Sequence, residues 1–223
     1  MDKYLDQSRK SWECASEFPP DKESVYPEHG FVQEFESIRN KSVYEYGCGG
    51  GSDVMSYLRR DNHVTATDIV QKNLDTTRNR VKTMLPAKLD DLNLVLLENS
   101  FPLPFENDTF DVISSHGVLH HIRQADEVIK ELYRVCKPGG SVYVMLYTDI
   151  LWQHHLPMME QLMAQRGIDQ YEAFCWCTDG EGTPYARCYT AVEATAFLED
   201  VGFTVVDFNY WLNDFFLTTK GVK

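Results

Sequence analysis

The sequence predicts a doubly wound α/β domain with a mostly parallel sheet, and three observations support this fold class. Strand-sized apolar runs alternate with amphipathic segments between residues 42 and 147, a glycine cluster at 47–51 follows the first run, and Asp68 follows the second. Alternating strands and helices form parallel sheets that helices cover on both faces. Because neighbouring parallel strands end at the same edge of the sheet, the glycines and the acid predict a ligand site there.

Each element of the alternation carries its own signal. The strands are short runs rich in β-branched and aromatic residues, and the helices show apolar residues at a spacing of three and four. A Pro-Gly-Gly sequence predicts a turn before the fifth strand. The expected strands are 42–46, 63–67, 94–97, 110–115 and 141–147, the expected helices between them are 52–60, 70–84 and 124–135, and the expected turn is 137–140.

The carboxyl-terminal segment predicts a helix and two strands at the sheet edge. Apolar residues recur at helical spacing over 190–201, and Gly202 follows as a stop. Two strand-like runs, 203–210 and 211–219, are separated near Asn213 and Asp214. A hairpin of this kind brings the sheet to seven strands, with an antiparallel strand at its edge.

Composition and charge narrow the possible functions. The first ten residues contain no apolar stretch, and the apolar runs are too short to span a bilayer, so we expect a cytoplasmic protein without a membrane segment. The net charge of −13, from 21 basic and 34 acidic residues, disfavours nucleic acid as a partner.

The six cysteines show no paired spacing and predict no disulfide framework. Cys175 and Cys177 would share one face of a strand, which would suit a soft metal or a thiol-reactive substrate. The favoured interpretation is two small apolar side chains.

The glycine cluster reads E-x-G-x-G-x-G from Glu45 to Gly51. Glycines at this place let the backbone turn tightly and approach a ligand. The amides at the start of the following helix can then donate hydrogen bonds to the ligand. A dinucleotide fingerprint, G-x-G-x-x-G, would need its third glycine at position 52, which is Ser52. The spacing therefore differs from that of nicotinamide-binding domains.

The cluster resembles motif I of the class I S-adenosylmethionine-dependent methyltransferases, and three more segments resemble that family's motifs in the same order. Residues 98–105 resemble the loop after the third strand, residues 110–122 the fourth strand with its Leu-His-His, and residues 137–140 the turn before the fifth. Together these segments extend over residues 40–147 and identify the chain as a member of the family.

The resemblance implies S-adenosylmethionine as cofactor and S-adenosylhomocysteine as product. It implies that the turn lines the amino-acid end, that Glu45 is an indirect partner of the ammonium group, and that Asp68 binds the ribose hydroxyls while Ile69 packs on the adenine. The alternative for Asp68 is a cap of the next helix. Asn99 stands where aspartate is frequent, and its amide oxygen can still accept from the adenine amino group. The implied cofactor-binding residues are Glu45, Gly47, Cys48, Gly49, Gly51, Asp68, Ile69, Asn99, Ser100 and His116.

Methyl transfer requires a base only if the acceptor arrives protonated. His116, at the end of the fourth strand, and His120 are the candidate catalytic residues; of His120 and His121 we expect one to face the site and the other to pack or be solvated. The alternative for each is a structural histidine. Gly117 and His120 stand where some relatives carry metal-binding glutamates, so no metal is predicted.

The segment 148–189 is rich in aromatic residues and histidine, and long insertions in compact domains are often functional. Trp152, His155 and Arg187 are its candidate substrate-binding residues, with a surface ion pair as the alternative for Arg187. We expect one domain over 1–223, divided into an N-terminal arm or lid (1–40, with a short helix at 31–40), a cofactor-binding core (41–147), a substrate cap (148–189), and the terminal helix with edge strands (190–223).

The expected function is S-adenosylmethionine-dependent methyl transfer to a small molecule, with an oxygen acceptor slightly favoured. The alternatives are a nicotinamide-dependent oxidoreductase and a non-catalytic S-adenosylmethionine-binding partner protein.

Overall fold

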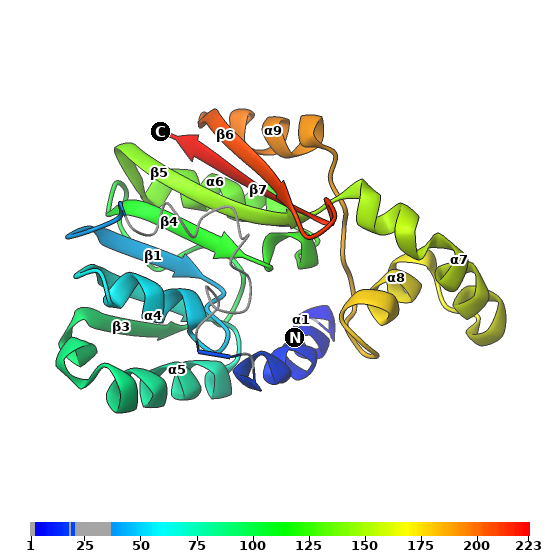
Figure 1. The fold of residues 1–223 in the computed structure, drawn as a ribbon, viewed down its shortest axis with the longest axis horizontal. Coiled ribbons are helices and arrows are strands. Elements are labelled where there is room, and N and C mark those ends of the chain that lie inside the picture. Colours follow the sequence, from blue (N-terminus) through cyan, green and yellow to red (C-terminus); the bar gives the residue numbers. More distant parts are fainter. Residues whose placement is uncertain (1–2, 18, 21–36) are drawn as a thin grey trace.

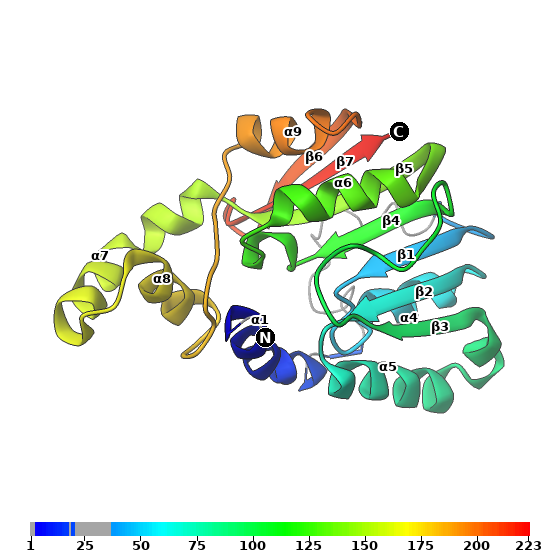
Figure 2. The same cartoon turned by 180° about the vertical axis from the view of Figure 1, so that it is seen from behind.

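The computed structural model describes residues 3–17, 19–20 and 37–223. Within them, one twisted sheet has the strand order β3-β2-β1-β4-β5-β7-β6, in which β7 runs antiparallel to both of its neighbours (Figure 1; β2 is labelled in Figure 2). The predicted fold class, seven strands with an antiparallel strand near the edge, is confirmed. The strands are β1 (Ser42–Tyr46), β2 (His63–Asp68), β3 (Leu92–Leu96), β4 (Phe110–His116), β5 (Cys136–Tyr147), β6 (Thr204–Trp211) and β7 (Phe216–Val222).

Helices cover both faces of the sheet, as Figures 1 and 2 show from opposite sides. On one face, α4 (Ser52–Leu58) and α5 (Gln71–Met84) enclose a core that includes Val43 of β1. On the other face, α6 (Ala125–Val135) and α9 (Ala191–Glu199) enclose a core that includes Tyr44, the next residue of β1. Because successive side chains of a strand point to opposite faces, one strand contributes to both cores.

The insertion between β5 and α9 folds as a helical pair, α7 (Asp149–Arg166) and α8 (Gln170–Thr178). Thr148 and Asp169 cap the two helices with their side chains. Figure 2 shows the pair projecting beyond the carboxyl ends of the parallel strands. Short 3₁₀ segments complete the described elements: η1 (Trp12–Glu17), which follows α1 (Lys3–Ser11), η2 (Pro86–Asp91) and η3 (Leu119–His121).

Three of the predicted local structures differ from the structure or lie largely outside its described residues. The predicted turn at 137–140 is wrong, because these residues belong to β5, where the Gly139 amide donates to the Lys223 carbonyl. Cys175 and Cys177 lie in α8 rather than in a strand, so a spacing of two places them on different sides of the helix. The helix expected over 31–40 falls largely outside the described residues.

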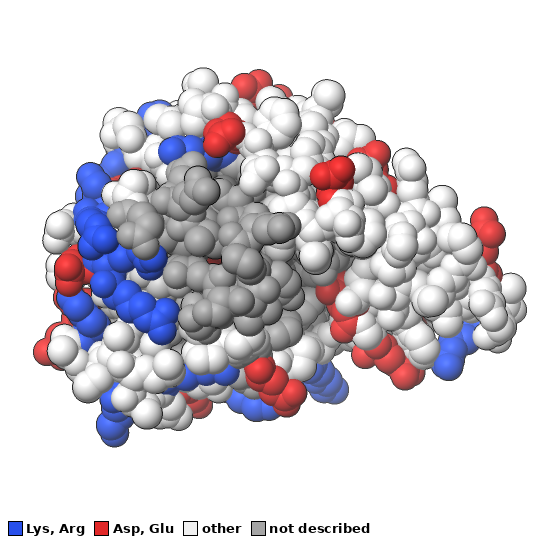
Figure 3. All heavy atoms as spheres, in the orientation of Figure 1, with Lys and Arg blue, Asp and Glu red and all other residues white. Residues whose placement is uncertain are grey.

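No helix in the described ranges is both long and apolar enough to cross a lipid bilayer. On the face drawn in Figure 3, Lys and Arg side chains gather near the end of the sheet at which β1 and β4 begin. This is the end opposite the carboxyl ends of the strands.

Candidate functional site

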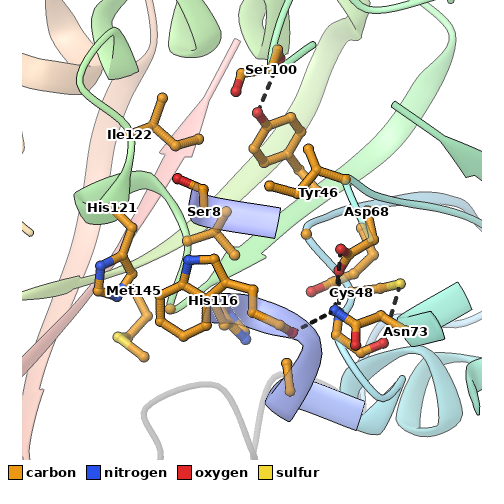
Figure 4. Close-up of a pocket in the computed structure, with 18 of the residues that line it drawn as sticks. Ser8, Tyr46, Cys48, Asp68, Asn73, Ser100, His116, His121, Ile122 and Met145 are labelled. Atoms are coloured by element: carbon orange, nitrogen blue, oxygen red, sulfur yellow. Dashed lines mark hydrogen bonds between the residues drawn. The ribbon is translucent and has the colours of Figure 1, made fainter. Parts of the chain in front are cut away.

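A cavity of about 720 Å³ lies at the carboxyl ends of β1, β2 and β4. This volume is in the range of pockets that hold cofactors and other small ligands. Figure 4 shows Cys48, Asp68 and Asn73 on one side of the cavity and His121 and Met145 on the other. The sheet edge predicted from the glycine turn and Asp68 is thus the edge that carries the cavity.

The glycine turn is fastened to β2 by its own backbone. The amides of Gly47 and Cys48 both donate to the Thr67 carbonyl at 2.9 Å. Gly47 has a φ of +78°, and a Cβ added to it would lie 2.5 Å from Val118 Cγ2. The turn therefore needs glycine here for its backbone conformation and for the approach of the loop after β4.

Asp68 joins the turn to the end of β2. Its Oδ2 accepts from the Gly49 amide at 2.9 Å, and its Oδ1 accepts from the Val70 amide at 2.8 Å. Burial raises the pKa of this carboxyl, and the hydrogen bonds from Val70 and Gly49 oppose the rise. The N-cap of α5 is Val70, so the alternative role of Asp68 as the helix N-cap is not realised.

The residues around the turn fit an adenosyl amino acid. Bare backbone at 47–49 faces the cavity, and the buried carboxylates of Glu45 and Asp68 line it. Asp68 Oδ1 also accepts from Asn73 Nδ2 at 3.2 Å, so among the described contacts Oδ2 is the oxygen that keeps a lone pair for a hydroxyl. Backbone amides can donate to the carboxylate of such a molecule, and the two carboxylates can accept from its ammonium group and its diol.

Nine of the ten predicted cofactor-binding residues line the cavity, and Gly51 does not. Gly51 instead precedes α4 with a φ of +83°, and a Cβ there would lie 2.6 Å from Thr77 Oγ1. Its position is explained by the packing of α4 against α5. The nine lining residues are Glu45, Gly47, Cys48, Gly49, Asp68, Ile69, Asn99, Ser100 and His116.

His116 forms a buried pair with Asp53 at the cavity. The His116 Nδ1 lies 2.7 Å from Asp53 Oδ2, and the two side chains are 0% and 6% exposed. An ionised carboxylate only accepts, so the ring donates Nδ1–H to Asp53, and in the neutral tautomer that this bond selects the lone pair lies on Nε2. The sequence reasoning missed Asp53, although its place in the first turn of the helix after the glycine cluster was a usable signal.

The Leu-His-His segment places its two histidines differently. His121 lines the cavity, whereas His120 is fully buried outside the lining and stacks on the Tyr147 ring with centroids 3.8 Å apart. One histidine therefore faces the site and the other packs, as expected. His120, predicted as a candidate catalytic residue, is the packed one, because η3 turns its ring beneath Tyr147.

A polar cluster closes the cavity on the side of the insertion. Tyr147 donates its hydroxyl hydrogen to Asp179 Oδ1 at 2.7 Å, and His121 Nε2 lies 3.7 Å from the same oxygen. Burial and the neighbouring Asp179 carboxylate raise the pKa of Tyr147, so its hydroxyl keeps its proton. Neither Tyr147 nor Asp179 was predicted, since only the folding of the insertion brings them together.

The N-terminal segment covers the cavity and touches both of its sides. The Tyr4 hydroxyl donates to the His121 carbonyl at 2.6 Å, and the Trp12 carbonyl accepts from Asn73 Nδ2 at 3.1 Å. Trp12 also lies against the His121 ring, with centroids 4.5 Å apart. The aromatic residues of the first thirty positions were the available signal for this contact.

The three predicted substrate-binding residues do not line the cavity. Trp152 packs against Phe174 with ring centroids 4.9 Å apart, and His155 also packs on Phe174, at 6.3 Å. Both residues therefore hold α7 against α8. Arg187 lies 3.6 Å from Glu193 and stacks on Tyr189. The structure thus realises the surface ion pair that was the alternative for Arg187.

Across the described ranges 3–17, 19–20 and 37–223, no three His, Cys, Asp or Glu side chains are grouped to hold a metal ion.

The two buried histidines make the stability of the protein sensitive to acid. Burial lowers the pKa of His120 well below its usual 6.5, helped by His121, and burial also lowers the pKa of His121, against Asp179. The unfolded chain therefore binds protons that the folded chain does not. Stability is full above pH 6.5 and falls below it, by up to about 2.7 kcal/mol per pH unit for two protons.

We expect urea unfolding at pH 5.5 to show a lower free energy than at pH 7.5. His120→Gln should lose about half of this pH dependence, whatever its effect on stability at pH 7.5. An unchanged pH dependence in that variant would contradict the role assigned to His120.

The comparisons with known proteins agree with the fold and match a methyltransferase domain. Residues 44–144 match the family model described as a methyltransferase domain. The ubiquinone biosynthesis O-methyltransferase of Chromobacterium violaceum is 28% identical over 145 residues, which cover 64% of this chain and 60% of that protein. The demethylmenaquinone methyltransferase of Symbiobacterium thermophilum is 26% identical over 151 residues, covering 61% and 59%. The chain thus spans less than two thirds of the length of these relatives.

Among solved structures, the chain is similar to one in the complex between the Haloferax volcanii Trm112 methyltransferase activator and a putative methyltransferase. The TM-score is 0.67 at 15% identity, and 96% of each chain is covered. Identity at this level establishes a shared fold, and the site must carry the function.

Proposed function

We propose that the chain, whose residues 44–144 match a methyltransferase domain, uses S-adenosylmethionine to methylate a small molecule. The observation that carries the proposal is that the bare turn after β1 and the Asp68 carboxylate after β2 line the same cavity. In this proposal the turn holds the amino-acid end of S-adenosylmethionine and Asp68 holds its ribose hydroxyls. The O-methyltransferase relative supports oxygen as the accepting atom.

When bound, S-adenosylmethionine supplies an electrophilic methyl group on a positively charged sulfur. The chain's contribution is to position the two reactants and exclude water, which can lower the activation barrier by on the order of 7–11 kcal/mol. Glu45 and Asp68 place negative charge beside the cofactor, and the N-terminal segment screens the cavity from solvent. His116 takes the acceptor's proton at Nε2 while Asp53 holds the ring by its Nδ1–H.

Calorimetry provides the test of the proposal. We expect S-adenosylhomocysteine to bind once per chain at micromolar affinity, and NADH to give no heat. A screen of phenols, catechols and hydroxybenzoates with methyl-labelled S-adenosylmethionine should then identify an acceptor. No heat with S-adenosylhomocysteine would overturn the proposal, and binding without turnover of any acceptor would identify the non-catalytic alternative.

The nicotinamide-dependent alternative shares the carboxylate after the second strand, and two other observations disfavour it. The insertion of an antiparallel β7 between β5 and β6 departs from the 3-2-1-4-5-6 strand order that is typical of dinucleotide-binding sheets. The last glycine of the cluster, Gly51, packs against Thr77 outside the cavity lining.

Replacement of His116 by glutamine should lower kcat about 100-fold with the best acceptor of the screen, because general bases contribute at least this much. Asp53→Asn should lower kcat in the same direction, since the amide no longer fixes the ring's tautomer. Binding of S-adenosylhomocysteine should change by less than threefold in both variants.

A more acidic acceptor separates a base from a structural residue. A nitro-substituted form of the acceptor phenol arrives ionised at neutral pH, so the deficit of His116→Gln should shrink at least tenfold. A deficit of equal size with both phenols would contradict the assignment of His116 as the base.

A further inference from the structure

One guanidinium faces the cavity from its rim. Arg123 precedes α6, is exposed, and lines the cavity. Its Cζ lies 5.0 Å from the centroid of the Tyr4 ring and 4.8 Å from that of Tyr185. An exposed side chain that also lines a cavity lies at its opening, so Arg123 marks the mouth.

The two rings come from segments far apart in the sequence. Tyr4 belongs to α1, and Tyr185 belongs to the segment that joins α8 to α9. Figure 2 shows α1 beside this segment, and Ser11 Oγ lies 2.7 Å from Thr183 Oγ1. Arg123 is thus held from two sides at the place where the N-terminal segment, the insertion and the sheet edge meet.

No carboxylate in the described part of the chain pairs with Arg123, although acidic residues outnumber basic ones by 34 to 21. Contacts with aromatic rings stabilise the positive charge but give the five N–H donors no oxygen acceptor. A guanidinium in this state is suited to receive a carboxylate or phosphate, which it binds through paired N–H···O bonds.

The charges of the cavity lining differ between the interior and the mouth. The other charged lining residues that the structure describes are acids: Glu45, Asp53, Asp68 and Asp179. These carboxylates repel an anionic group from the interior, while Arg123 attracts one to the mouth. A ligand with one anionic end therefore has a preferred orientation, with that end at Arg123 and the rest inside.

We propose that Arg123 is a specificity-determining residue, which binds an anionic group, a carboxylate or a phosphate, on the methyl acceptor. The inference rests on the proposed function and names the class of its substrate: a small molecule with an anionic group at one end and the accepting atom at the other. Tyr4 and Tyr185 act as positioning residues that hold the guanidinium at the mouth. The sequence reasoning assigned such a clamp to Arg187, which the structure pairs with Glu193 instead.

The test compares acids with their neutral amides. The probes are benzoate, phenylacetate, 3-phenylpropionate and phenyl phosphate, and the neutral partners are the three amides and phenol. Each is titrated into the protein loaded with S-adenosylhomocysteine, and binding is followed by tryptophan fluorescence and calorimetry. We expect at least one acid to bind tenfold or more tightly than its neutral partner. Comparison of the affinity for phenyl phosphate with the affinities for the three carboxylates identifies the preferred anion.

Variants assign the preference to one residue. Arg123→Gln should lose the preference, and Arg123→Lys should retain part of it, because the charge remains without the planar fork. Arg166→Gln is the matched control, since Arg166 also stacks on an aromatic ring, Trp176 at 4.1 Å, but does not line the cavity. This control should keep the full preference.

Three results would overturn the inference: no acid preferred over its partner, a preference that survives in Arg123→Gln, or an equal loss in Arg166→Gln. Affinity for S-adenosylhomocysteine should be unchanged in Arg123→Gln, and a tenfold loss would place Arg123 at the cofactor instead. A protein that binds S-adenosylhomocysteine without preferring acids refutes only the role of Arg123. A protein that binds no S-adenosylhomocysteine refutes the proposed function.

Discussion

Replacement of Asp68 by alanine is expected to weaken the binding of S-adenosylhomocysteine at least 100-fold. The proposed contacts are hydrogen bonds from the ribose hydroxyls to a charged acceptor, and each such bond contributes about 1.5–3 kcal/mol. A loss of about 2.7 kcal/mol already corresponds to 100-fold. The same carboxylate also fastens the Gly49 and Val70 amides, so the variant loosens the turn that faces the amino-acid end.

Two further variants give this prediction its controls. Asp68→Asn keeps one oxygen acceptor, but its NH₂ group would face one of the two backbone amides, and two donors cannot bond to each other. Its affinity for S-adenosylhomocysteine should therefore lie between those of the original protein and Asp68→Ala. Asp75→Ala removes a carboxylate of α5 that bonds only to Gln71 among the described contacts, and calorimetry should show unchanged affinity. If Asp68→Ala bound S-adenosylhomocysteine with an affinity within threefold of the original protein, the proposed contact between Asp68 and the ribose would be wrong.

Replacement of Gly47 by alanine is expected to cost about 2–4 kcal/mol of stability and at least tenfold in affinity for S-adenosylhomocysteine. The φ of +78° disfavours any side chain by about 1 kcal/mol, and the new methyl group would lie 2.5 Å from Val118. Relief of that clash must move either the glycine turn or the loop after β4, at a typical cost of 1–3 kcal/mol. Both segments line the cavity.

Gly139→Ala separates strain from clash. Gly139 has nearly the same φ, +76°, and nothing lies within 4 Å of an added Cβ. Urea unfolding should show a loss of about 1 kcal/mol for this variant, with cofactor affinity unchanged. The double variant Gly47→Ala with Val118→Ala should regain the part of the loss that comes from the clash. Equal losses for Gly47→Ala and Gly139→Ala would show that Val118 is not the obstacle.

Local sequence patterns predicted the helices and strands well where each element depends on residues close together in the sequence. The helix 124–135 was expected from apolar residues at 128, 129, 132 and 135, and all four are buried in α6. The turn at 137–140 failed for the opposite reason. Its Pro-Gly-Gly signal is local, but the backbone pairs with the carboxyl-terminal residue of the chain, 83 or more positions away.

The candidate site divides in the same way. The turn and Asp68 follow successive strands of one parallel sheet, so their meeting is a consequence of strand order, which the sequence pattern contains. Asp53 and His116 come from different elements, and Tyr147 meets Asp179 only after the insertion has folded as a helical pair. Trp152 and His155 showed the right composition for a pocket, but that composition served the packing of α7 on α8.

The amino-acid sequence was sufficient to predict the alternation of strands and helices, the parallel sheet, and the edge that carries the cavity, because these depend on periodicity and on residues at strand ends. The packing of the folded chain was needed to show which side chains face the cavity opposite the turn, and that Arg123 rather than Arg187 lines it. These side chains belong to α1, the loop before α6 and the insertion, which meet through long-range packing. No spacing along the chain encodes the distance between segments that meet only in this way.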